Sequence, residues 1–205
     1  MDADFSIELG SDDPVLDFPW KDDAGKLSYV DIKRRPELID QIAEAQKFHE
    51  LKSFLCLVNS SRTTLETAKC DVWTTKELSA EEEIYGASCK FESYVDLLFS
   101  NAAETLPTSS GSEQRLSFSN HEQFARKLVE LLRRAPDISS AAEACVRRCF
   151  LENNGEVQEG FYFTVYVRGY GCDEAAAQAS WEVGLRLVGN AVVQLSAATK
   201  TRSIK

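Results

Sequence analysis

An eleven-residue stretch near the carboxyl end of the chain, FYFTVYVRGYG at residues 161–171, has the strict alternation of a β-strand. Successive side chains of a strand point to opposite faces, so one face is apolar and suits a core, with Phe161, Phe163, Val165 and Val167. The opposite face carries Tyr162, Thr164, Tyr166, Arg168 and Tyr170. The chain therefore requires a sheet with one covered face and one face of mixed polarity, and the use of that second face is the main functional question.

The other periodic segments predict an α+β fold in which an antiparallel sheet carries its helices on one face. Residues 89–99 alternate in the same half-exposed manner and predict a strand with Tyr94 and Asp96 on its polar side. Further strands are expected at residues 5–9, 29–32, 51–59, 69–75 and 143–152. Helices are expected to begin at Pro36, at the capping boxes that start with Ser79 and Ser119, and at the cap Asp173. The last helix carries an apolar stripe that includes Trp181.

The two halves of the chain show the same order of expected elements. The tetrapeptides YVDI (29–32) and YVDL (94–97) fall at the same point of each half, which favours a tandem pair of ferredoxin-like β-α-β-β-α units, although four residues also coincide by chance. Two such units are expected to pack as one globular body. The expected segments are an acidic arm at 1–25, a first unit at 26–87 and a second unit at 88–200 with a mobile loop at 101–118.

The charge distribution bears on possible partners. A net charge of -10 opposes nucleic-acid binding, which draws on clustered Lys and Arg. Residues 1–20 hold six acids and no base, while residues 115–150 hold seven bases and four acids. The arm is expected either to fold onto that basic region or to stay solvated. No apolar run is long enough for a bilayer and the first residues are acidic, so a cytoplasmic protein is expected.

No motif in the chain predicts a catalytic, cofactor-binding or metal-ligating residue. The six cysteines include no CxxC pair, and Cys145 and Cys149 would lie on one strand face with Arg147 between them, which favours packing over a redox pair. The two histidines, His49 at a helix end and His121 in a helix first turn, have no partners at a catalytic spacing. RGYGCDE at 168–174 lacks the pattern of a phosphate loop.

The first hypothesis is therefore a non-catalytic interaction or regulatory module that meets a protein partner or a second copy through its aromatic sheet face. The residues of that face are Tyr162, Tyr166, Arg168, Tyr170, Tyr94 and Asp96, and they are expected to be buried against protein. The alternative is an enzyme or small-ligand binder with a pocket between the halves, lined by Tyr94, Asp96, Tyr166 and Arg168. A weaker alternative is stacking of single-stranded RNA on the tyrosines, and the simplest is a solvated strand.

Overall fold

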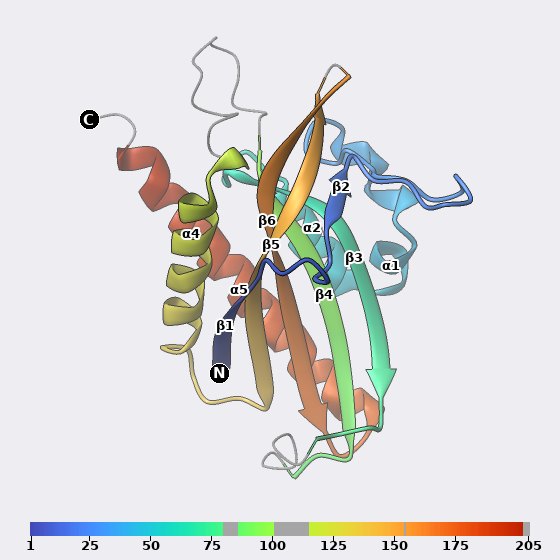
Figure 1. Cartoon of the computed structure of the whole chain (residues 1–205). Coiled ribbons are helices and arrows are strands. Elements are labelled where there is room, and N and C mark those ends of the chain that lie inside the picture. Colours follow the sequence, from blue (N-terminus) through green and yellow to red (C-terminus); the bar gives the residue numbers. More distant parts are fainter. Residues whose placement is uncertain (80–85, 101–114, 154, 203–205) are drawn as a thin grey trace.

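The computed structural model describes residues 1–79, 86–100, 115–153 and 155–202. Its strands form one mixed sheet in the order β1-β5-β6-β4-β3, with β2 also paired to β5 (Figure 1). The strands are β1 (Asp2–Glu8), β2 (Leu16–Phe18), β3 (Leu65–Thr75), β4 (Cys89–Phe99), β5 (Ser140–Asn153) and β6 (Glu156–Gly171). The helices are η1 (Pro36–Gln41), α1 (Ala43–Lys47), α2 (His49–Val58), α4 (Phe118–Leu132) and α5 (Glu174–Arg202). The expected α+β class is confirmed.

The sheet is mixed, so the expectation of a purely antiparallel sheet is wrong. The pairs β3 with β4, β4 with β6 and β6 with β5 are antiparallel, but β1 and β2 both run parallel to β5. A tight hairpin forces two strands to be antiparallel, whereas β1 and β5 lie more than 130 residues apart and no hairpin fixes their direction.

The tandem ferredoxin-like arrangement does not appear either. Residues 29–32 form no strand, and the described elements give strand, strand, helix twice, as β3-β4-α4 and β5-β6-α5. The YVDI and YVDL tetrapeptides therefore lie in different kinds of structure.

The expected strand at 51–59 is the helix α2. Its buried residues Leu51, Phe54, Leu55 and Val58 follow the helical spacing, which a short apolar run does not distinguish from a strand. His49 consequently begins a helix and does not end one. Ser117, two residues before the expected cap, accepts the capping hydrogen bond of α4 from the Asn120 amide.

All the described helices contribute to one core on a single face of the sheet, where buried residues of α1, α2, α4 and α5 join the apolar side chains of β4, β5 and β6. Helix α5 comes close to β6 because Gly169 lies beneath it: a Cβ there would stand 2.2 Å from the Ala177 carbonyl oxygen. Trp181 fills the centre of the core, stacks near Phe91 with ring centroids 4.9 Å apart, and donates its indole N–H to Ser93 Oγ at 2.8 Å.

The amino-terminal arm covers part of the opposite face. Leu16 and Phe18 of β2 pack with Leu98, Leu151 and Tyr162 in a second, smaller core. Strand β1 lies along β5, and Glu8 and Asp4 form ion pairs with Arg147 and Arg133. Of the two expectations for the arm, the one in which it folds onto the basic region is confirmed.

Two expected segments fall largely outside the described residues, namely the short helix after Ser79 and the loop at 101–118. Among the described helices, none combines the length and apolar character needed to cross a membrane.

We expect Trp181→Ala to lower the free energy of unfolding by about 3 to 5 kcal/mol, because the indole is fully buried and its loss leaves a cavity. Phe150→Ala is the control, since that residue is 44% exposed and its truncation should cost less than about 1 kcal/mol. Urea unfolding of both variants measures the difference. Equal losses would show that α5 is not packed as described.

Candidate functional site

The side of the sheet opposite the helices, which we call the open face, brings together four of the six residues predicted from the sequence. Tyr94 of β4 lies directly opposite Tyr166 of β6. Two residues before and after Tyr94 on the same face, Glu92 lies opposite Arg168 and Asp96 lies opposite Thr164. The antiparallel register of β4 and β6 thus places Tyr94, Asp96, Tyr166 and Arg168 in one patch at the centre of the sheet.

Arg147 of β5 is the hub of one polar network on this face. Its guanidinium forms an ion pair with Glu8 at 2.6 Å and donates to Thr164 Oγ1 at 2.9 Å and to the Tyr166 hydroxyl at 3.1 Å. Thr164 in turn donates to Asp96 Oδ1 at 2.7 Å. Burial alone lowers the pKa of Arg147, but the hydrogen bonds to Tyr166 and Glu8 raise it above its ordinary value, so the guanidinium stays charged.

Asp96 is a buried carboxyl of this patch whose charge changes near neutral pH. Its side chain is 6% exposed, and burial raises its pKa to about 6, while the hydrogen bond from Thr164 and the charges of Arg147 and Lys69 oppose the rise. A carboxyl tuned this way can act as an acid or base, or it can be a structural member of a buried network.

Arg168 forms the second network. Its Nε donates to Glu92 Oε1 at 2.7 Å, and its Nη2 donates to Glu143 Oε2 at 3.2 Å. Glu143 also accepts a hydrogen bond from Ser6, and Glu92 forms an ion pair with Lys90. The pairing of Arg168 with Glu92 occurs within the sheet, between directly opposed residues.

Three aromatic rings cross the open face in a row. The ring centroids of Trp73 and Tyr94 lie 6.2 Å apart, and those of Tyr94 and Tyr166 also lie 6.2 Å apart. Arg147 and Arg168 each lie 5.6 Å from the Tyr166 centroid, within the range of a cation–π contact. Trp73 is exposed, and Tyr94 and Tyr166 are partly exposed. We call these three rings the aromatic row.

The other two predicted residues lie apart from this patch. Tyr162 is buried in the small core beneath β2, and Tyr170 is buried at the far end of β6. The sequence did not single out Trp73, Glu143 or Arg147 as site residues. Arg147 could have been recognised from the sequence as a candidate. It lies between Cys145 and Cys149 on one face of a predicted strand, so its charge stands among side chains that are otherwise buried.

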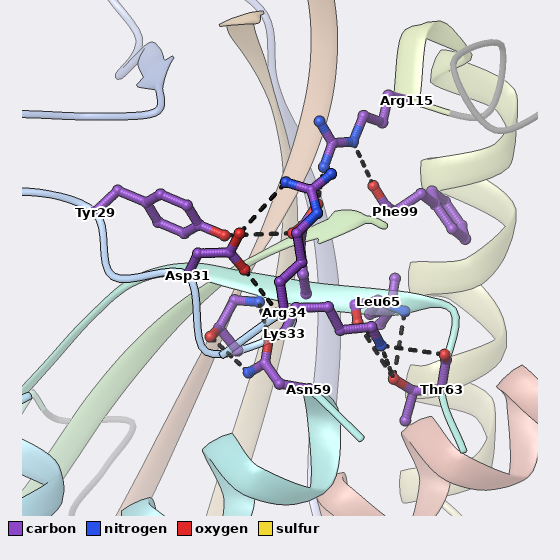
Figure 2. Close-up of polar contacts among 11 residues, drawn as sticks. Tyr29, Asp31, Lys33, Arg34, Asn59, Thr63, Leu65, Phe99 and Arg115 are labelled. Carbon is purple, nitrogen blue, oxygen red and sulfur yellow. Dashed lines mark hydrogen bonds and ion pairs between the residues drawn. The ribbon is translucent and has the colours of Figure 1, made fainter. Parts of the chain in front are cut away.

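A second polar cluster closes the end of the small core (Figure 2). Arg115 forms an ion pair with Glu66, donates to the Phe99 carbonyl at 2.7 Å, and lies over the Phe18 ring. Tyr29 donates to the same Glu66 at 3.4 Å. Burial lowers the pKa of Arg115 to about 10. These contacts join β3, β4 and the segment before α4, which is a structural role.

Lys33 forms hydrogen bonds with the chain segment between α2 and β3. Figure 2 shows its ammonium beside Thr63 and Leu65, and it donates to the carbonyl oxygens of Ser60, Thr63 and Leu65 at 2.9, 3.3 and 2.8 Å. The ammonium thus satisfies carbonyls in the turn that follows α2.

A cavity of about 350 Å³ lies at the edge of the sheet beside β3. Tyr94 lines it, but Asp96, Tyr166 and Arg168 do not. The walls are the β3 bulge between Thr67 and Cys70, the segment after β2, and the junction of η1 with α1. This cavity is therefore not the pocket expected between two halves and lined by all four residues.

The cysteines and histidines show no catalytic arrangement within the described chain. Cys145 and Cys149 are free and fully buried, and burial raises the pKa of Cys149 to about 12. His121 is buried against Phe99 and bonds the Ser117 carbonyl oxygen through Nδ1, and burial lowers its pKa to about 4. Among the described residues, no group of three His, Cys, Asp or Glu side chains is placed to hold a metal ion.

Comparisons of the chain with protein-family models, with curated proteins and with solved structures find no match.

We expect Asp96→Asn to change how stability depends on pH. The folded-state pKa of about 6 lies above the ordinary carboxyl value, so protonation favours the fold, and this stabilisation is lost as the pH rises from about 4 through 6. The unfolding free energy of the variant should therefore exceed that of the natural protein by an amount that increases over this pH range. The difference should reach at most about 3 kcal/mol and then stay constant. Urea unfolding at several pH values measures it. The exposed Asp137→Asn is the control, and a parallel pH profile for the two variants would contradict the assignment.

Proposed function

We propose that this protein is a non-catalytic interaction module that binds protein through its open face. The observation that carries the proposal is the aromatic row of Trp73, Tyr94 and Tyr166, which crosses three strands on the side of the sheet opposite the helices. Aromatic side chains and Arg are the residues from which protein interfaces gain most of their binding energy.

The polar groups around the aromatic row support this function. Arg147 and Arg168 already have carboxylate partners within the sheet, so a partner that covers the face need not supply a counter-charge for either. A contact that leaves such pairs intact avoids the main electrostatic cost of burying charged residues.

A second copy of this chain is the partner that the charge pattern around the aromatic row permits. The chain carries a net charge of -10, so most contacts between two copies bring like charges together. Around the aromatic row, the charged side chains of β3 to β6 are the four acids Asp71, Glu92, Asp96 and Glu143 and the four bases Lys69, Lys90, Arg147 and Arg168, while Glu66 and Glu156 lie farther along the same side. In a two-fold contact the same patch meets itself, which requires a self-complementary surface of this kind.

We expect the protein to form dimers at micromolar concentration and Trp73→Ser to weaken the dimer at least about tenfold, because Trp73 is an exposed aromatic at the start of the row. Sedimentation velocity across a concentration series measures the association. Phe150→Ser is the matched control, since that ring is 44% exposed on a strand but lies on the other side of the sheet. A natural protein that stays monomeric, or a Trp73→Ser variant that associates as the natural protein does, would refute the homodimer.

We also expect no useful binding of single-stranded RNA at physiological salt. The two arginines near Tyr166 are engaged by Glu8, Glu92 and Glu143 and are not free for phosphates. Fluorescence anisotropy with a labelled oligonucleotide tests this. Tight, salt-sensitive binding that Tyr166→Ala abolishes would favour the stacking function instead.

A further inference from the structure

The cavity beside β3 has the size and lining of a small-molecule site. Its volume of about 350 Å³ lies within the range of ligand pockets. Leu27, Val30, Ile42 and Leu55 give it apolar walls, and Leu27 is 65% exposed at that surface. An exposed leucine that faces a cavity offers contact area to an apolar group without any change in the fold.

The charged groups of the cavity determine which ligands it can accept. Asp22, Glu44 and Asp71 line it, against the single base Lys69. The pKa of Cys70 is raised to about 12, first by burial and then by the charges of Glu44 and Asp71. Burial and the charges of Asp96 and Asp71 likewise raise the pKa of Tyr94 above its ordinary value. Two separate groups therefore report a negative potential, which disfavours an anion and favours a cation.

One wall of the cavity already holds a cation. The Lys69 ammonium lies 5.4 Å from the centroid of the Trp20 ring, and the Trp20 N–H is fixed by the Ala68 carbonyl oxygen at 2.6 Å. Lys69 is exposed and its side chain is long, so its ammonium can move into water and leave the indole face to another cation. The ring itself is held in place by its hydrogen bond to the β3 bulge.

We propose that this cavity binds a small organic amine, with the apolar part of the ligand against Leu27, Val30 and Ile42 and its ammonium group near Glu44 and Asp71. The inference does not require the proposed dimer, although Lys69, Asp71 and Tyr94 belong to both the cavity and the open face. No covalent step is involved.

A charge series of similar shape tests the proposal. The probes are 2-phenylethylammonium, 2-phenylethanol and 3-phenylpropionate, each titrated into the full chain at low ionic strength and followed by methyl NMR and calorimetry. The ammonium should bind at least about tenfold more tightly than the alcohol, the carboxylate should bind least, and the methyl signals of Leu27, Val30 and Ile42 should shift while those of Leu128, in the helix-side core, stay in place.

Two double variants test the role of charge. Glu44→Gln with Asp71→Asn should remove the preference for the ammonium over the alcohol. Asp23→Asn with Glu37→Gln makes the same change of net charge at exposed residues outside the cavity lining and should keep that preference. The inference is overturned if the natural protein binds the ammonium and the alcohol equally, if it binds none of the probes, or if the shifted signals lie outside the cavity. Sedimentation velocity of the natural protein in the same buffer separates the two proposals, because the ammonium should bind whether or not the protein dimerises.

Discussion

The buried guanidinium of Arg147 is the contact on which the arrangement of the sheet depends. From β5 it reaches Glu8 on β1 and Thr164 and Tyr166 on β6, and through Thr164 it is linked to Asp96 on β4. Four strands from distant parts of the sequence therefore share one hydrogen-bonded network. Removing Arg147 would take a donor and a charge away from the buried Thr164 and Asp96, which costs more than a single hydrogen bond contributes. The network thus holds the acidic arm against the sheet and fixes which residues surround Tyr166.

The alternation of apolar and polar residues correctly predicted the strands at the centre of the sheet, because the period of two in a strand follows from backbone geometry alone. The polar faces of β4 and β6 were correct residue by residue, and their register brings Tyr94 and Tyr166 together as neighbours. The same approach failed at 51–59, where LKSFLCLVN is apolar enough to suit either a buried strand or a helix. The parallel pairing of β1 with β5 could not be predicted, because no local turn links them.

The composition of the open face also depended on contacts that a sequence does not reveal. Tyr162 and Tyr166 are equivalent in the alternation, yet β2 covers Tyr162 in the small core and Tyr166 stays partly exposed. Arg147 joined the site because β5 happens to lie beside β6, and Trp73 because β3 lies beside β4. Strand order is a tertiary property, so a pattern within one strand cannot show which residues of the next will stand beside it.

The cavity and the open face are two consequences of one feature, the irregular edge of β3. The register of β3 shifts between Thr67 and Cys70, which places a bulge inside the strand next to the chain segment that follows β2. Beyond this bulge, Asp71 and Trp73 face the open side, whereas at the bulge itself Ala68 anchors Trp20 and space remains beside the strand. Tyr94, on the neighbouring strand, lies where the two surfaces meet. The bulge therefore both starts the aromatic row and keeps the adjacent cavity from being filled.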